Sequence, residues 1–293
     1  MTYPCEVISL ETIKRLNEVS LLDFVNLVNE VFKDYKLPIN WDVYTFKLDA
    51  RENSLSFEDS FVFYENGDPT GFIVVGIRRN KARIDAMGVI REKRGTGLAS
   101  RILEHAIENL KWKSVNTVIL EVIEEDERAV RFYQKNGFKV QRKLHTLGFE
   151  DKVTNAPLLR FFKTDARWIH KVALETQIQN HRKPNWQREP LTLFLSDERY
   201  NMERVSFRGK EGYLVWGTTS TSAFIVDCFV RDSSLESFLE FFKGCVNHVR
   251  KRSGKELITM TAVPEDDILH KAARNMGFKI ILTQLEMSLR IHA

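Results

Sequence analysis

One short segment, residues 89–100, limits the possible folds of this chain more than any other. It reads as the end of a strand, a turn with two glycines and the first turn of a helix. Gly95 and Gly97 permit backbone conformations that other residues avoid, and they let a ligand approach the main chain. The free N–H groups at the start of the next helix then point toward an anion. This order predicts an α/β domain with a phosphate-binding loop.

Two common phosphate loops do not fit these residues. A Walker loop requires GxxxxGK[ST], and Gly95 is followed five residues later by Ser100. A dinucleotide fingerprint requires GxGxxG, and Ser100 stands at its third glycine. The pattern that does fit is RGxGxA, at residues 94–99 after a hydrophobic strand. It resembles the acetyl-CoA loop of the GNAT superfamily of N-acetyltransferases.

A second motif lies downstream in the expected order. Residues 129–138, AVRFYQKNGF, resemble the AxxFYxxxGF signature of the same family. Between the motifs, hydrophobic periodicity predicts a helix from Leu98 to about Asn109 and an apolar strand at residues 117–123. Upstream, Asn66-Gly67 predicts a hairpin turn, followed by a strand at residues 83–90. The resemblance covers residues of about 5 to 150.

The second half of the chain repeats the first in weakened form. Residues 136–140, NGFKV, match residues 276–280, MGFKI, and the offset of 140 also pairs residues 118–126 with 258–266. Matched segments in the same order imply a duplicated domain. We therefore predict two tandem GNAT-like domains, residues 1–153 and 154–293. Each is expected to be α/β, with a mixed, mainly antiparallel central sheet flanked by helices.

The second copy has lost the features of a phosphate cradle. Leu235 and Ser237 replace the two loop glycines, and Ala273 replaces Tyr133. Side chains then stand where the backbone must approach a pyrophosphate. We interpret this copy as degenerate, with a structural or substrate-shaping role, and place the boundary near residues 151–157. Residues 159–164 then resemble an opening strand, and Asp165 is expected to cap the helix that follows it.

Composition narrows the class of protein further. With 293 residues and 43% hydrophobic content, the chain can bury two ordinary cores. Its three cysteines form no CxxC pair, so neither a disulfide framework nor a metal site is expected, and a reducing cytoplasm fits best. We expect no secretion leader and no membrane span. The net charge of +4 is small, and the sequence has no stripe of basic residues, so we expect no nucleic-acid partner.

The resemblance implies a set of residues that hold acetyl-CoA as co-substrate. Backbone N–H groups of the loop would bind the pyrophosphate, Arg94 would add charge, and the strand before the loop would contact the pantetheine arm. Asp126 stands where relatives often have an asparagine that contacts this arm. The alternative is a glycine turn that only begins a helix. The proposed cofactor residues are Val89, Ile90, Arg91, Arg94, Gly95, Thr96, Gly97, Leu98, Ala99, Ser100, Asp126 and Tyr133.

Direct amide formation from a thioester needs three further groups. The Val89 N–H would polarise the carbonyl, as in the family, and Tyr133 would protonate the departing thiolate. A carboxylate would deprotonate the amine; Glu121 is the first choice and Asp85 the second. For Tyr133 the alternative is a packed aromatic residue. For the two acids it is an ordinary strand residue paired with a neighbouring cation.

The acceptor is the least constrained part of the prediction. Four acids at residues 124–127 follow the strand that leads toward the acceptor, and they would attract a cationic amine such as a polyamine or an amino sugar. Alternatively, they are a solvated loop and helix start. We expect a small-molecule or peptide amine; the oligomeric state is open. A non-catalytic acetyl-CoA sensor, or a pair of degenerate binding modules, remains as an alternative.

Overall fold

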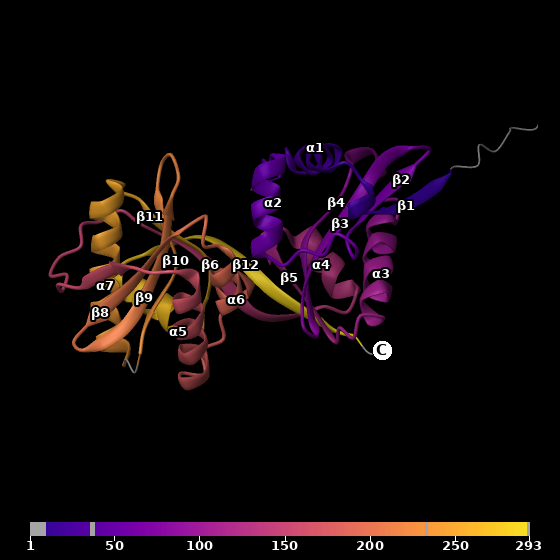
Figure 1. Cartoon of the computed structure of the whole chain (residues 1–293). Helices are drawn as coiled ribbons and strands as arrows, with labels where there is room; N and C mark the ends of the chain where they lie inside the picture. Colours follow the sequence, from indigo (N-terminus) through magenta and orange to yellow (C-terminus); the bar gives the residue numbers. More distant parts are fainter. Residues whose placement is uncertain (1–9, 36–38, 232–233, 292–293) are drawn as a thin grey trace, which may run out of the picture. The chain divides into compact units, whose positions relative to one another are not determined.

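The computed structural model describes residues 10–35, 39–231 and 234–291, and its backbone separates into two compact units (Figure 1). The first unit contains Met1–Leu120, Asn136–Phe138 and Ser288–Ala293. The second contains Glu121–Lys135 and Lys139–Met287. Cys5 lies outside the described residues.

The first unit is a sheet of the order β1-β2-β3-β4-β5 with helices on both faces. Its strands pair antiparallel except β4 and β5, which run parallel. Phe72 of β3 packs with the first two helices, whereas its neighbour Gly71 faces Ile102 of the third helix. The elements are β1 (Glu11–Arg15), η1 (Leu16–Glu18), α1 (Leu21–Phe32), α2 (Val43–Glu52), β2 (Phe61–Glu65), β3 (Asp68–Arg78), β4 (Lys81–Val89), η2 (Arg91–Lys93), α3 (Leu98–Lys111) and β5 (Thr117–Ile123).

Local sequence signals in this unit are confirmed. Asn66 and Gly67 have φ of +55° and +91°, the pair of positive angles that a two-residue hairpin turn requires. The helix expected from Leu98 is α3, and its buried residues repeat at helical spacing, from Leu98 through Ile102 and Ala106 to Leu110. The predicted apolar strand is β5, with the same limits as expected.

In the second unit the strand order is β6-β11-β10-β9-β8-β7. Only β10 and β11 run parallel among these pairs. Asp165 caps α5, as expected, by accepting a hydrogen bond from the Trp168 N–H at 2.8 Å. The elements are α4 (Glu127–Lys135), β6 (Lys139–Phe149), β7 (Arg160–Lys163), α5 (Ala166–Gln179), η3 (Trp186–Arg188), α6 (Pro190–Leu195), β8 (Asn201–Phe207), β9 (Lys210–Thr218), β10 (Ala223–Val230), α7 (Leu235–Ser253), β11 (Ile258–Pro264), α8 (Ile268–Met276) and β12 (Lys279–Arg290).

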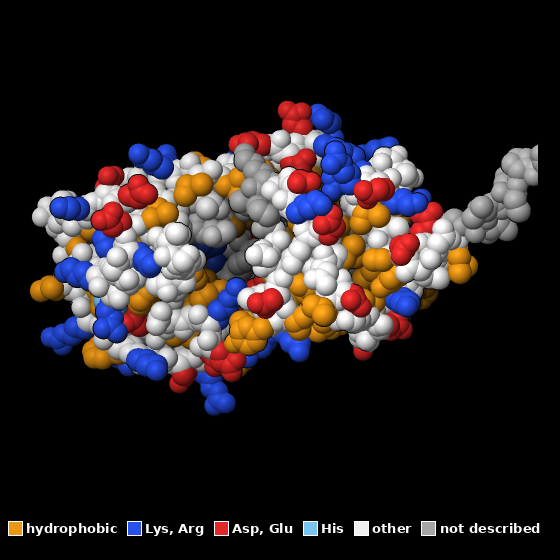
Figure 2. All heavy atoms as spheres, turned by 90° about the horizontal axis from the view of Figure 1, so that it is seen from above, with side chains coloured by type: hydrophobic (Ala, Val, Ile, Leu, Met, Phe, Trp, Pro, Cys, Tyr) orange, Lys and Arg blue, Asp and Glu red, His pale blue; other side chains and the backbone are white. Residues whose placement is uncertain are grey.

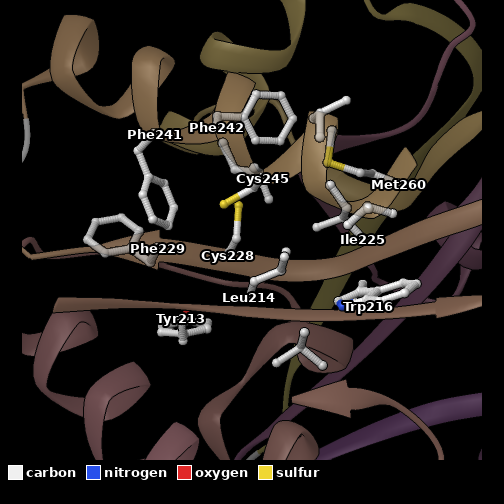
Figure 3. Close-up of a cluster of buried hydrophobic side chains, with 14 of the residues drawn as sticks. Tyr213, Leu214, Trp216, Ile225, Cys228, Phe229, Phe241, Phe242, Cys245 and Met260 are labelled. Carbon is white, nitrogen blue, oxygen red and sulfur yellow. The ribbon is translucent and has the colours of Figure 1, made fainter. Parts of the chain in front are cut away.

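A large apolar core joins α7 to the second sheet. Phe238, Phe242 and Cys245 of α7 are fully buried against β10. Figure 3 shows Cys228 and Cys245 with their sulfur atoms pointing toward each other inside this core. Both thiols are free, and burial raises the pKa of Cys245 well above its ordinary value, so this thiol is held protonated.

The two sequence repeats exchange their last strands. β6 belongs to the first repeat, yet it pairs antiparallel with β11 of the second, with Phe149 opposite Ile258. At the end of β12, the Ile291 N–H donates to the Asn116 carbonyl in the first unit at 3.0 Å. The compact units therefore have different limits from the repeats. The boundary between residues 153 and 154 stays a prediction about the repeats.

The duplication is visible in the strand irregularities. Asp85 is a bulged residue, because its neighbours Ile84 and Ala86 pair with the adjacent residues Val75 and Val74. A second bulge lies between Ile225 and Asp227, at nearly the same point of the second repeat. A bulge bends a strand locally. The corresponding strands β4 and β10 of the two repeats are therefore bent at nearly the same point.

Candidate functional site

The glycine loop has the backbone conformation that its sequence predicts. After β4 ends at Val89, the chain passes through η2, and Gly95 and Gly97 have φ of +84° and +86°. Gly97 is the N-cap residue directly before α3. A Cβ atom on Gly95 would meet no atom within 4 Å, so open space and a left-handed backbone coincide there. Both properties suit a loop that takes a ligand against its main chain.

Hydrogen bonds hold this loop in place. The Arg94 guanidinium donates to the carbonyls of Val89 and Val31, each at 3.2 Å, so it braces the loop against β4 and α1. The Thr96 hydroxyl donates to the Lys93 carbonyl at 2.8 Å. Arg94 thus has a bracing role that the sequence did not indicate. Its contact with a pyrophosphate stays a prediction.

The first turn of α3 presents its backbone donors at the loop. The Ser100 N–H already donates to the Gly97 carbonyl at 3.1 Å. Leu98 and Ala99 precede this bond, and the N–H groups of a first turn have no helical acceptor. The Leu98 side chain is buried, which fixes the start of the helix. The donors suited to an anion are therefore those before Ser100.

The strand that leads into the loop loses its partner early. The parallel ladder joins Lys81–Ile84 of β4 to Thr117–Leu120 of β5 and ends there, although β4 continues to Val89. On its other edge, β4 stays paired with β3 as far as Val89, and the Ile90 N–H donates to the Thr70 carbonyl at 3.0 Å. The main chain of β4 beyond Ile84 can therefore pair with an extended ligand.

Asp85 and Glu121, the two candidate bases, have different partners. Asp85 forms an ion pair with Arg83, and both side chains are only 9% exposed. A carboxylate in such a pair loses attraction when it accepts a proton, which favours the structural role considered for Asp85. Glu121 lies on β5 one position after the ladder ends, is half-buried, and accepts a hydrogen bond from Gln187 Nε2 at 2.8 Å.

Gln187, which contacts the candidate base Glu121, is not among the residues that the sequence indicated. It lies in η3 of the second repeat. No local pattern marks it, because a single glutamine beside a tryptophan has no helical or strand periodicity of its own. Its relation to Glu121, 66 residues away, comes from tertiary structure.

Tyr133 and Asp126 both belong to the segment around α4. Tyr133 is half-buried, and its ring packs edge-on against Phe132 with centroids 5.2 Å apart. Asp126 caps α4, since Asp126 Oδ1 accepts a hydrogen bond from the Ala129 N–H at 3.0 Å. A contact of Asp126 with the pantetheine arm remains a prediction, because this carboxylate already has a structural role.

The acids at residues 124–127 are largely engaged by local partners. Glu124 pairs with Lys143 at 2.7 Å, and this contact raises the pKa of Lys143. Glu127 pairs with Arg131 at 2.8 Å one helical turn away. With Asp126 as a helix cap, these contacts favour a solvated loop and helix start over a bare acidic surface.

The matching region of the second repeat contains a buried ion-pair cluster. The β10–β11 ladder ends at Phe224 and Thr259, and the Arg182 guanidinium, almost fully buried, bonds to Asp227 at 2.7 and 2.8 Å and to Asp267 at 2.8 Å. Burial lowers the pKa of Arg182, but the two carboxylates raise it above its ordinary value. These ion pairs form a buried cluster between the segment around Arg182, β10 and the start of α8.

A cavity of about 570 Å³ lies next to this cluster. Its walls include Phe229, Leu235 and Asp266, the counterparts of Val89, Gly95 and Asp126 at the offset of 140 residues. The glycine-loop backbone has no equivalent there, since Leu235 and Ser237 open α7 and Ser234 caps it.

Charge and hydropathy of the described residues are unremarkable in distribution. On the face in Figure 2, basic and acidic side chains are interspersed, with apolar patches between them. None of the described helices is both long and apolar enough to cross a membrane. Within residues 10–35, 39–231 and 234–291, no group of three or more His, Cys, Asp or Glu side chains is arranged to hold a metal ion.

Comparison with known proteins identifies similar sequences. Residues 23–138 match the acetyltransferase (GNAT) family. An uncharacterised N-acetyltransferase of Methanocaldococcus jannaschii is 28% identical over 144 residues, which cover 45% of this chain and 62% of the relative. The match thus spans less than two thirds of that protein.

Solved structures share the fold over almost the whole chain. A GCN5-related N-acetyltransferase from Sphaerobacter thermophilus has a TM-score of 0.68 at 13% identity and covers 97% of this chain and 96% of its own. A tandem GNAT protein from the clavulanic acid biosynthesis pathway has a TM-score of 0.65 at 12% identity, with coverage of 96% and 98%. A fungal glucosamine N-acetyltransferase region has a TM-score of 0.71 at 14% identity, with coverage of 96% and 38%.

Proposed function

We propose that this chain, a tandem-domain acyltransferase that belongs to the GNAT acetyltransferase family through residues 23–138, transfers an acetyl group from acetyl-CoA directly to an amine. The co-substrate binds the first repeat, and both substrates are present together, without a covalent acyl-enzyme. Among the described cysteines, Cys228 and Cys245 are buried in the core of the second unit, which supports a route without a cysteine nucleophile.

The observation that carries this proposal is the loop at residues 91–100. Two glycines in left-handed conformation lead into a helix directly after a strand whose ladder has ended. The donors of the first turn and the dipole of α3 suit a pyrophosphate, and the guanidinium of Arg94 adds positive charge. The main chain of β4 up to Val89 suits an extended pantetheine arm.

Each remaining residue has one proposed role. Acetyl-CoA supplies a thioester carbon that an amine can attack. The Val89 N–H donates to the thioester oxygen as negative charge develops there. Tyr133 donates its hydroxyl proton to the departing thiolate, and Glu121 accepts a proton from the amine, directly or through water. Asp85 is the second choice of base, because its carboxylate forms an ion pair with Arg83.

The acceptor is proposed to be a small-molecule or peptide amine. Glu124 and Glu125 would favour a cationic acceptor, although the Lys143 pair already offsets one of these charges. One structure of similar fold is a glucosamine N-acetyltransferase region, so an amino sugar belongs in the first acceptor screen beside polyamines.

A thermal-shift titration with acetyl-CoA and free coenzyme A tests the cofactor site. Binding to the folded state stabilises it by mass action, by about 2.7 kcal/mol at a hundredfold excess over Kd. We expect a dose-dependent shift that the double variant Gly95→Leu/Gly97→Ser abolishes. Gly67→Leu is the matched control, because Gly67 also has positive φ and open space but lies in a hairpin.

The outcomes separate the main possibilities. A shift in the control but not in the double variant supports the loop as the binding site. A shift without release of thiol in the presence of amines favours a non-catalytic sensor. The absence of any shift in the unmodified chain would reject the proposal.

A further inference from the structure

One side chain of the second repeat, Gln187, forms a hydrogen bond with Glu121, the proposed base in the first repeat. Gln187 Nε2 donates to Glu121 Oε2 at 2.8 Å. We propose that Gln187 is a positioning residue for Glu121, so that the degenerate repeat orients the proton acceptor used in acetyl transfer. This inference rests on the proposed function and adds a task for the second repeat.

A directed chain of hydrogen bonds fixes the orientation of the Gln187 amide. Arginine can only donate, and Arg188 Nη1 donates to Asn185 Oδ1 at 3.2 Å. The Asn185 amide nitrogen must then face away from Arg188, and it donates to Gln187 Oε1 at 2.6 Å. The Gln187 amide nitrogen is thereby directed at Glu121. Each step follows from the one before, so the donor reaches the carboxylate in a single orientation.

Gln187 lies in the loop of residues 182–188, and buried groups anchor this loop on both sides of Gln187. On one side, Arg182 is held by Asp227 and Asp267 and also donates to the Tyr213 hydroxyl at 3.3 Å. On the other, Arg188 is 3% exposed and donates to the Ala262 carbonyl of β11 at 2.9 Å.

Trp186 is itself 1% exposed and accepts a hydrogen bond from the Thr192 hydroxyl at 2.5 Å. A donor on a loop fixed in this way is already in position before substrate arrives, which limits the loss of freedom on binding.

The two candidate bases contact different donors. Gln187 Nε2 is a neutral donor to the Glu121 carboxylate, whereas Asp85 contacts the Arg83 guanidinium. Burial lowers the pKa of Arg188, and the charge of Glu121 is one of those that raise it, so Arg188 also acts on this carboxylate electrostatically. The hydrogen bond from Gln187 is the contact that orients the Glu121 carboxylate.

The anchors of this loop lie on the strands β10 and β11. Arg182 bonds to Asp227 of β10, and Arg188 bonds to Ala262 of β11, beyond the point where these strands stop pairing. In the first repeat β4, the counterpart of β10, leads to the glycine loop.

The contact is tested first without any acceptor. In an amide-labelled full-length chain, the side-chain signals of Gln187, assigned by their loss in Gln187→Leu, should shift with pH as Glu121 titrates. In Glu121→Gln this titration should disappear. Signals that do not respond to pH, or that respond equally in Glu121→Gln, would overturn the inference.

The function of the contact is tested by thiol release from acetyl-CoA, alone and with spermidine or glucosamine. Gln187→Leu should lower the rate by about 10- to 100-fold with acetyl-CoA affinity unchanged. It should also move the acidic limb of the pH profile upward, because the ionised carboxylate loses a donor. Gln187→Glu should move this limb further, since a second carboxylate faces the first.

Controls separate positioning from folding and from the proposed function. Gln179→Leu changes an exposed glutamine at the end of α5 and should alter neither rate nor pH profile. In a Glu121→Gln background, Gln187→Leu should add no further loss. Equal effects of Gln187→Leu and Gln179→Leu would overturn the positioning role alone. No thiol release by the unmodified chain would instead reject the proposed function, and the inference with it, whereas the amide titration would still report the contact.

Discussion

At the scale of single residues, the proposed chemistry depends on what each polar group already contacts. Asp85 forms an ion pair with Arg83, Asp126 caps a helix, and Glu121 accepts a hydrogen bond from the Gln187 amide. The order of the two candidate bases stays a prediction. Tyr133 is half-buried against Phe132, so its packing and its proposed proton transfer can be separated by removing only the hydroxyl.

Tyr133→Phe keeps the ring beside Phe132 and removes the proposed general acid. We expect turnover to fall by about 10²- to 10⁴-fold, the usual contribution of a general acid, while the Kd for acetyl-CoA stays unchanged. Thiol release and calorimetric titration measure the two quantities separately. Tyr44→Phe, at an exposed position of α2, is the control. If Tyr133→Phe matches this control, Tyr133 is a packing residue only.

At the scale of elements, β6 and α8 meet through two histidines. His145 Nδ1 and His270 Nε2 are 2.8 Å apart, a hydrogen bond that needs one protonated and one unprotonated nitrogen. Burial lowers the pKa of both imidazoles, and each is lowered further by Arg274. The other charged groups around the pair are Lys143, Glu124, Glu265 and Asp267.

This pair predicts a loss of stability in mild acid. The folded-state pKa of each histidine lies below the unfolded value of about 6.5, so the unfolded chain binds protons first as pH falls. The free energy of unfolding should therefore decrease below about pH 6.5 and level off above it. Urea midpoints between pH 5 and 8 measure this slope. His270→Gln should flatten it, and His170→Gln in α5 should not. Equal slopes in the two variants would contradict the prediction.

At the scale of the whole molecule, the exchanged strands make the repeats depend on each other. A fragment of residues 1–153 contains β6 without β11, and residues 154–293 contain β11 without β6. An unpaired strand edge invites aggregation. Without the degenerate repeat, β6 of the intact repeat would lack its partner β11, which is a reason why the degenerate repeat is retained.

Splitting the chain between residues 153 and 154 tests this dependence. We expect the two fragments to aggregate when expressed separately and to purify together when co-expressed, because β6 and β11 then complete one sheet. Affinity capture through a tag on one fragment, followed by size-exclusion chromatography, measures the complex. A first fragment that ends at Phe138 lacks β6 and should capture its partner more weakly. Two fragments that are each monomeric and folded alone would contradict the expected exchange.

The local features of this protein follow from its amino-acid sequence. The glycine loop, the Asn66-Gly67 hairpin, α3, β5 and the duplication were all predictable, because backbone preference and hydrophobic period are properties of residues close together in the chain. The family resemblance then indicated which loop carries the proposed site.

The pairing of segments that are distant in sequence depends on the folded chain as a whole. β6 and β12 both begin at the lysine of a Gly-Phe-Lys motif. Their local sequence therefore does not indicate which strands each of them pairs with. The bond between Glu121 and Gln187 likewise spans 66 residues and has no local signal. Such pairings are selected by loop closure and by packing of the whole chain, whereas propensity acts on neighbours. For this reason the sequence predicted the elements, and tertiary structure alone determined their partners.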